Sequence, residues 1–409
     1  MTLIWGIGMP RITDFDSQQN EGKMPRFSEK WSRFGTSIFT TMTVAANRFG
    51  AVNLAQGFPN FDGPEEIKAA AIEAIRGNFN QYAPSIGIPR LRTLLAHRML
   101  KTSGLSYDPE TEITVYAGAT EALFCVFQAF LSPGDEVIAF APFFDCYPAG
   151  AFSSGAKLVE VQLKSPDWTF NLEDLEAAVS PQTKMILVNT PHNPTGRVFT
   201  KDEMTLIADF AKRHDLLVVT DEVYEELIYD DLPFTRMATL DGMRERTVII
   251  SSTAKTFSLT GWKVGFTYAP PHLTRELRGI HQFTVFCGAT PLQAGICAAL
   301  ELSDKYYADL RREYTSRRDH LCDGLKRLGF RFLRPQGTYF VVADYSHLSN
   351  KPDTEFALWL AEHKKVAVIP TSTFYEKPDV VAARQSYVRF AFCKDIETLE
   401  LALKNLREH

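Results

Sequence analysis

The sequence predicts an α/β fold, in which a large α/β/α domain with a mixed, mostly parallel sheet is joined to a smaller α+β domain. Between residues 110 and 270, short apolar runs that end in Gly, Pro, Asn or Asp alternate with longer segments of helical period. This alternation is typical of a parallel sheet covered by helices. After residue 300, a long amphipathic segment precedes three strand-like runs with hairpin-like spacing. That change of pattern indicates the smaller α+β domain.

Length and composition narrow the function classes. The chain has 409 residues, a net charge of −5 and six cysteines without a C-x-x-C pair. A chain this long is expected to form more than one small hydrophobic core. The acidic balance disfavours nucleic-acid binding, and the scattered cysteines suggest reduced thiols in a cytoplasmic protein rather than a zinc site. No apolar run reaches the roughly 20 residues that span a bilayer, so we expect no membrane partner. From the cysteine spacing we also expect no bound metal.

The strands and helices of the large domain follow in order. We expect helices over residues 121–131 and 201–214, and strands within "ITVY", "EVIAFAP", "AKLVEVQL", "TKMILVN", "LLVVTD", "RTVIISS" and "WKVGFTYAP". Each strand delivers polar residues at its C-terminal end, where ligands collect in open parallel sheets.

The smaller domain is expected to combine two parts of the chain. A long helix covers residues 306–328, and "GTYFVVADY", "VAVIPTSTFY" and "SYVRFAFC" are its strands. We predict a flexible arm over residues 1–30, a large domain over 61–300, and a small domain built from 31–60 and 301–409. The first residues lack a basic leader, so secretion is not expected.

Several polar residues sit where apolar strands end. Asp221 follows such a strand, where an ionised carboxylate needs a cationic or hydrogen-bonding partner, although a helix N-cap is the simpler interpretation of a lone Asp. The "NPTG" turn containing Asn193 is, by itself, only a turn. "YAGATEAL" joins a strand to a helix start, a place that favours a phosphate.

Lys255, in "SSTAKTFSLTGWKVG", lies at such a strand end with Lys263 nearby. Burial and the second cation would lower the pKa of its amine, and such an amine forms a Schiff base with an aldehyde. Ser252 and Lys263 add a hydroxyl and a cation for the phosphate. The usual alternative is a solvated lysine on a loop.

These motifs, with "PFFDCY", "DEVY" and "YVRFAFC" in the same order, resemble the fold type I, aspartate-aminotransferase-like enzymes that use pyridoxal 5'-phosphate (PLP). Through "NLAQGFPNFDGP", "NQYAPSIG" and "TGWKVG", the resemblance is nearest to the class I branch of kynurenine, glutamine-phenylpyruvate and methionine aminotransferases. It extends from about residue 34 to the C-terminus.

The resemblance implies the following cofactor contacts. Lys255 would carry the Schiff base and act as the general base, Asp221 would pair with the pyridinium nitrogen, and Tyr224 and Asn193 would hydrogen-bond the phenolic oxygen. Phe144 would stack on the ring. The phosphate would lie against Gly118, Ala119, Thr120, Ser252 and Lys263, with Tyr82 donated by the other subunit of a homodimer whose active sites lie at the subunit interface.

The resemblance also implies substrate contacts. Arg389 would clamp the substrate α-carboxylate, because its planar fork suits a carboxylate better than lysine does. Asn193 would also touch the carboxylate, and Gly57 would let the backbone approach the substrate. Phe39 and Phe286-Cys287 replace the tryptophan and the aromatic-histidine pair of related enzymes. These departures fit an apolar pocket and weaken the prediction of kynurenine or glutamine recognition.

The leading hypothesis is therefore a transaminase that moves the amino group of an L-amino acid (methionine, glutamine, aromatic or kynurenine-like) to a 2-oxo acid. A β-lyase acting on cystathionine or cysteine S-conjugates shares the first steps and stays open. A ligand sensor fused to a DNA-binding domain is the less favoured class, since only about thirty residues precede the first motif.

Overall fold

The structure, a computed structural model, describes residues 31, 34–382 and 385–408. Residues 37–409 form one compact unit, and the account below concerns its described part. The predicted arm, residues 1–30, lies outside the described residues. No helix within the described part is both long enough and apolar enough to cross a membrane.

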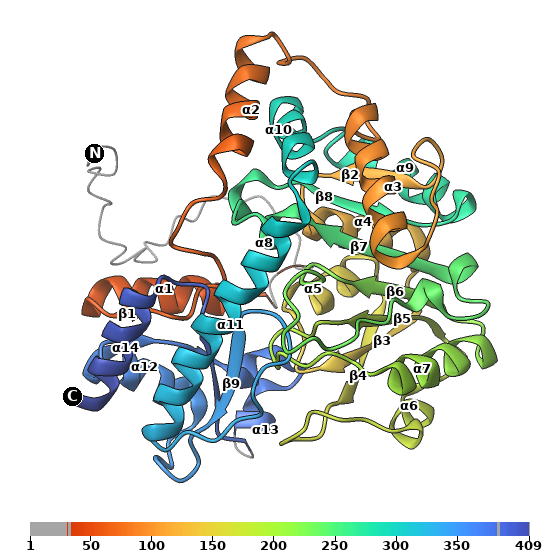
Figure 1. Ribbon diagram of the computed structural model, residues 1–409. Coiled ribbons are helices and arrows are strands. Elements are labelled where there is room, and N and C mark those ends of the chain that lie inside the picture. Colours follow the sequence, from red (N-terminus) through yellow and green to blue (C-terminus); the bar gives the residue numbers. More distant parts are fainter. Residues whose placement is uncertain (1–30, 32–33, 383–384, 409) are drawn as a thin grey trace, which may run out of the picture. The chain divides into compact units, whose positions relative to one another are not determined.

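A seven-stranded sheet is the centre of the large layer (Figure 1). Only β8 runs antiparallel to its neighbours, so the predicted mixed, mostly parallel sheet is confirmed. In spatial order the strands are β2 (Ile113–Tyr116), β8 (Gly265–Tyr268), β7 (Thr247–Ser252), β6 (Leu217–Asp221), β5 (Thr183–Asn189), β3 (Glu136–Ala141) and β4 (Lys157–Gln162).

Helices cover both faces of this sheet because its strands are apolar on both sides. Val137 and Ala139 of β3 join one core, while Ile138 and Phe140, which alternate with them, join another. The first core also contains residues of α4 (Ala119–Phe130), α5 (Cys146–Ser153) and α9 (Pro271–Thr284), and the second contains residues of α6 (Leu172–Ala178) and α7 (Lys201–Arg213).

Local signals set the helix ends. In α7, the Thr200 hydroxyl accepts from the Glu203 N–H, and the Glu203 carboxylate accepts from the Thr200 N–H, which forms a capping box. A third core lies under α2 (Glu65–Arg76), α3 (Pro89–Ser103) and α10 (Thr290–Leu300). Short helices complete this part: α8 (Thr253–Thr256), η2 (Met237–Thr239), η3 (Arg244–Arg246) and η4 (Thr260–Trp262).

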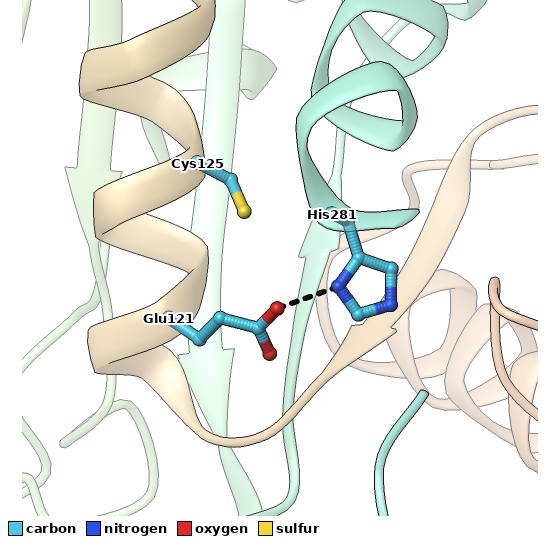
Figure 2. Close-up of side chains that lie close together, drawn as sticks. All are labelled: Glu121, Cys125 and His281. Carbon is cyan, nitrogen blue, oxygen red and sulfur yellow. Dashed lines mark hydrogen bonds and ion pairs between the residues drawn. The ribbon is translucent and has the colours of Figure 1, made fainter. Parts of the chain in front are cut away.

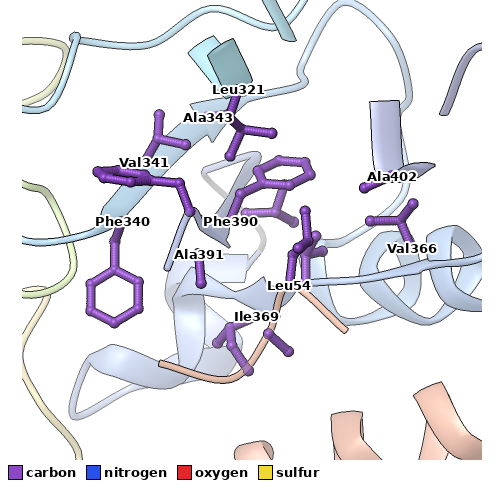
Figure 3. Close-up of a cluster of buried hydrophobic side chains, with 14 of the residues drawn as sticks. Leu54, Leu321, Phe340, Val341, Ala343, Val366, Ile369, Phe390, Ala391 and Ala402 are labelled. Carbon is purple, nitrogen blue, oxygen red and sulfur yellow. The ribbon is translucent and has the colours of Figure 1, made fainter. Parts of the chain in front are cut away.

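A three-stranded antiparallel sheet, in the order β11 (Ile369–Pro370), β12 (Tyr387–Ala391) and β9 (Phe340–Asp344), forms the second layer. Its buried side chains pack against helices from both ends of the described chain (Figure 3). These helices are α1 (Ile38–Phe49), α11 (Asp304–Arg327), α12 (Asp353–His363) and α14 (Ile396–Glu408), with α13 (Pro378–Ala382) and η5 (Thr371–Phe374) alongside.

One expected strand is divided. Residues 366–375 form β10 (Val366–Ala367), which pairs in parallel with β1 (Val52–Asn53), and then β11, which pairs with β12. The chain changes partner at Val368, and Pro370 has no N–H to continue a ladder, so the backbone turns into η5. The division of the chain into domains at residues 61 and 301 stays a prediction.

Candidate active site

The C-terminal ends of the parallel strands meet at one edge of the large sheet. In the ladder, Asn189 of β5 pairs with Asp221 of β6, and Ser252 of β7 pairs with Gly265 of β8. Gly265 also pairs with Tyr116 of β2. Because β8 is antiparallel, its beginning lies at the edge where its neighbours end, and this places Lys263 beside the ends of β2 and β7.

One cavity opens at this edge. Ten of the eleven predicted cofactor-binding residues line it: Gly118, Ala119, Thr120, Phe144, Asn193, Asp221, Tyr224, Ser252, Lys255 and Lys263. Tyr82, the eleventh, is 83% exposed and lies outside the cavity. Its ring packs edge to face on Phe286, with the ring centroids 5.5 Å apart.

Lys255 lies in α8, directly after β7. Its Nζ is 5.8 Å from the ring centroid of Tyr224 and 5.7 Å from that of Tyr339. Burial, with smaller contributions from Lys263 and Arg389, lowers the pKa of the amine to about 8 against the opposing effects of Cys393 and Asp221. Near neutral pH, an appreciable fraction of this amine is therefore neutral and nucleophilic.

Asp221 ends β6 with its carboxylate buried in the cavity wall. Its Oδ2 accepts a 2.7 Å hydrogen bond from the Tyr147 hydroxyl, and Oδ1 accepts from the Val223 N–H at 3.3 Å. Burial raises the pKa of Asp221, while the bonds from Tyr147 and Val223 and the charge of Lys255 oppose that rise. The carboxylate is thus oriented, and a cationic N–H in the cavity would stabilise its ionised form.

The turn after β5 links Asp221 to the three-stranded sheet that contains Arg389. The Asn189 side chain donates to the Asp221 carbonyl at 2.8 Å and accepts from the Asn193 N–H at 2.7 Å. In turn, the Asn193 amide oxygen accepts from Arg389 Nη1 at 3.0 Å. The two sheets therefore contribute to one connected set of hydrogen bonds.

Arg389 lies in the middle of β12 and is 1% exposed. Its guanidinium donates from Nη2 to the Ala55 carbonyl at 3.0 Å, whereas its buried Nε has no hydrogen-bond partner. Three rings surround it, with centroids 3.9 to 5.3 Å from Cζ: Phe340, Phe374 and Phe39. Burial lowers the pKa of Arg389 to about 10.

No ion pair neutralises this arginine among the described residues. A buried cation held only by neutral acceptors is unfavourable until an anion arrives. A carboxylate is the anion that matches the planar fork.

An anion-binding cradle lies at the start of α4. Gly118 precedes the helix with a φ of +90°, and no side chain caps the first turn, so its N–H groups face outward. A Cβ on Gly118 would lie 2.9 Å from Lys263 Nζ. Helix N–H groups and an ammonium group at this spacing suit a phosphate. The cavity therefore offers an anion cradle, a reactive amine and an oriented carboxylate, which together match the phosphate, the aldehyde and the ring nitrogen of PLP.

The predicted substrate residues divide into two groups. Phe39 and Arg389 lie together, and the Gly57 carbonyl accepts from the Tyr339 hydroxyl at 2.5 Å. A Cβ on Gly57 would lie 2.7 Å from Phe340 Cζ, so the glycine is explained by this ring, and the approach of a substrate remains a prediction. Phe286 is 44% exposed and does not line the cavity of its own chain.

Two contributors were not predicted from the sequence: Tyr147 and Phe340. Tyr147 lies in "PFFDCY", three residues after Phe144, and its N–H donates to the Phe144 carbonyl at 3.0 Å where the chain enters α5. That spacing was the available signal, because residues joined by a turn lie close together. Phe340 gives no such signal, since it is one apolar residue in an apolar strand.

The chain is similar to known proteins over most of its length. The family model described as aminotransferase class I and II matches residues 50–406. The solved structure of N-succinyldiaminopimelate aminotransferase from Mycobacterium tuberculosis is 40% identical, with a TM-score of 0.90, covering 93% of this chain and 99% of that one. A methionine aminotransferase structure from Escherichia coli is 34% identical with a TM-score of 0.90, covering 94% and 100%. Kynurenine–oxoglutarate transaminase 1 of Mus musculus is 37% identical over 89% of this chain and 93% of its own length.

Proposed function

Since the chain belongs to the class I and II aminotransferase family and is a PLP-dependent transaminase, we propose that Lys255 carries its cofactor and that its amino donor is an apolar L-amino acid. Methionine and the aromatic amino acids are the favoured donors, and a 2-oxo acid receives the amino group. The observation that carries the donor proposal is Arg389, a buried cation that forms no ion pair within the described part of the chain and is set among Phe39, Phe340 and Phe374.

We assign the cofactor's contacts from one end of the cavity to the other. When bound, PLP supplies an electron sink that stabilises negative charge at the substrate α-carbon. The start of α4, with Ser252 and Lys263, binds the phosphate. Asp221 keeps a proton on the ring nitrogen, and Tyr147 holds the Asp221 carboxylate in place. Phe144 orients the ring, and Tyr224 and Asn193 bind the phenolic oxygen.

Lys255 has two tasks in this proposal. It binds the cofactor, and it then moves a proton to and from the substrate α-carbon. Its lowered pKa supports both tasks, because the neutral amine is the form that attacks an aldehyde and accepts a proton. Lys255 shares the cavity with Asp221 and is close enough to Arg389 for that charge to act on its amine, so a base held in the site would move the proton and no diffusing base is needed.

Arg389 fixes the substrate by its α-carboxylate. The three rings around the guanidinium leave apolar surface, rather than a second cation, next to the bound carboxylate. This arrangement favours methionine and aromatic donors over the acidic N-succinyldiaminopimelate named for the mycobacterial relative. Glutamine and kynurenine are the weaker candidates.

We also propose a homodimer in which Tyr82 of one subunit reaches the phosphate site of the other. Support comes from exposed aromatic side chains: Tyr82, 83% exposed, packs on Phe286, 44% exposed, and Phe283, three residues before Phe286, is 87% exposed. Single exposed rings are ordinary, but a group of them is typical of an interface. Sedimentation velocity of the purified protein should show a dimer, and a monomer with full activity would contradict the proposal.

A donor panel tests the function. We expect L-methionine and L-phenylalanine, with 2-oxoglutarate as acceptor, to give the corresponding 2-oxo acids, and N-succinyldiaminopimelate to give none. Borohydride reduction followed by peptide mapping should place the pyridoxyl group on Lys255. Release of pyruvate from cystathionine without transamination of any donor would identify a β-lyase instead, and a label on another lysine would contradict the assignment of Lys255.

A further inference from the structure

Three buried side chains that do not line the cavity lie close together: Glu121 and Cys125, one turn apart on α4, and His281 on α9 (Figure 2). Glu121 Oε1 and His281 Nδ1 are 2.6 Å apart and share a hydrogen bond. Each partner makes one further bond. His281 Nε2 donates to the Ser85 carbonyl at 2.8 Å, and Glu121 Oε2 accepts from the Ala117 N–H at 2.5 Å.

The bonds fix how many protons the pair holds. A carbonyl oxygen only accepts, so His281 Nε2 carries a hydrogen. The contact between Nδ1 and Oε1 then needs one more proton, which belongs either to an imidazolium beside a carboxylate or to a carboxylic acid beside a neutral ring. In both forms the pair has no net charge. This explains how a carboxyl and an imidazole remain together in an apolar core.

The same three side chains have the residue types of a metal centre, but their geometry does not fit one. Zinc ligands lie about 2.0–2.2 Å from the ion for nitrogen and oxygen, which puts tetrahedral neighbours more than about 3 Å apart. The 2.6 Å separation of Glu121 Oε1 and His281 Nδ1 is too short. Burial also raises the pKa of the Cys125 thiol to about 12, away from the thiolate that a metal binds.

The bonds of the pair join two segments that serve phosphate sites: the start of α4, at the site of its own subunit, and the Tyr82 segment, which reaches the site of the other subunit in the proposed homodimer. Ala117 immediately precedes Gly118, where the cradle begins, and Glu121 lies in the first turn of the same helix. Ser85 lies three residues after Tyr82, in the segment 80–88. Helix α10 holds both ends of this segment, since Thr290 donates to the Gln81 carbonyl and Gln293 accepts from the Ile88 N–H. His281 holds its middle.

We propose that Glu121 and His281 are positioning residues for the cofactor phosphate: they hold the start of α4, which serves the phosphate site of its own subunit, and the Tyr82 segment, which serves the site of the other subunit in the proposed homodimer, so that each site has both phosphate contacts in place before PLP binds. This inference rests on the assignment of the phosphate to the start of α4. Its consequence is that Glu121 and His281 should raise the affinity only for ligands that carry a phosphate.

The test compares PLP with pyridoxal, which lacks the phosphate, by fluorescence titration of the apoprotein. Glu121→Met and His281→Phe each remove the shared bond while keeping an apolar side chain of similar size. We expect each to weaken PLP binding at least ~10-fold, because the lost hydrogen bond holds the segments that bind the phosphate. Pyridoxal has no phosphate, so its binding should weaken less than ~2-fold. The double variant should be no weaker than the worse single variant, because the two residues act as a unit.

Two matched variants sharpen the result. Glu121→Gln keeps a donor for His281 Nδ1 and an acceptor for the Ala117 N–H, so PLP affinity should return to within ~3-fold of the wild type. Cys125→Ala, on the same helix, should leave the ratio of PLP to pyridoxal affinity unchanged. A stoichiometric metal ion in the purified protein that is lost in Cys125→Ala would overturn the proposal in favour of a metal centre.

Lys263→Ala separates this inference from the function on which it rests. If Lys263→Ala leaves PLP affinity unchanged, the phosphate assignment itself is wrong. If Lys263→Ala weakens PLP binding but Glu121→Met and His281→Phe do not, only the positioning role is refuted. Equal losses for PLP and pyridoxal would show that the pair serves general stability, and this outcome would also refute the proposal.

Discussion

The buried amine of Lys255 makes the apoprotein less stable than it would be with an uncharged side chain. Replacing Lys255 by Met removes the charge and keeps most of the volume. The ordinary lysine pKa of 10.5 falls to about 8 in the folded protein. At about 1.4 kcal/mol for each tenfold change in proton affinity, this corresponds to about 3 kcal/mol. The value is an upper bound, because Lys255 keeps some surface toward the cavity.

The sign follows from proton linkage. Below pH 8 the amine is charged in both the folded and the unfolded state, so the folded state bears the full cost of burying it. Between pH 8 and 10.5 the folded protein loses this proton while the unfolded chain retains it, and wild-type stability gains from this group as pH rises. Lys255→Met lacks the effect. It should therefore be more stable than the wild type at pH 7, by up to about 3 kcal/mol, and the difference should disappear toward pH 10.5.

Urea unfolding of the two apoproteins by circular dichroism, at fixed protein concentration from pH 7 to 10, measures this difference. Lys404→Met, at an exposed position on α14, is the control and should show no such pH dependence. A stability difference between Lys255→Met and wild type that stays constant over this pH range would refute the reasoning. So would a lower stability of Lys255→Met at pH 7.

Three other substitutions test separate parts of the candidate active site. Tyr147→Phe removes the 2.7 Å bond to Asp221. We expect titrations to show that the affinities for PLP and pyridoxal both fall ~10-fold or more, because a buried hydrogen bond to a charged group contributes about 1.5–3 kcal/mol. A loss of affinity confined to PLP would contradict this. Gly118→Ala adds a Cβ 2.9 Å from Lys263 Nζ at a φ of +90°. Thermal unfolding should therefore show a free energy of unfolding lower by about 1–3 kcal/mol, and PLP should bind more weakly. An unchanged melting temperature would argue against the strain. Arg389→Lys replaces a planar fork, which bonds Asn193 and Ala55 from separate nitrogens, by a single ammonium group. Steady-state kinetics should therefore show kcat/KM reduced ~10-fold or more while PLP affinity is retained. An unchanged kcat/KM would remove Arg389 from the substrate site.

Much of the fold was predictable because it depends on local patterns. Uninterrupted apolar runs such as 185–188 predict strands buried on both faces, and Thr200 with Glu203 marks a helix start. The order of these elements favours a parallel sheet whose C-terminal edge holds the ligand. The position of β8 as the one antiparallel strand was not predictable, because the direction of a strand depends on contacts that its own residues do not encode.

The candidate site divides in the same way. The sequence by itself determined which residues stand at strand ends, and Lys255, Asp221 and Lys263 are found in one cavity as their positions suggested. The tertiary structure decided their partners. Tyr147 reaches Asp221 across 74 residues, Arg389 reaches Asn193 across 196, and His281 reaches Glu121 across 160. Periodicity fixes which face of an element a side chain occupies, whereas a hydrogen bond between distant elements exists only after the cores have packed and fixed the distance between them.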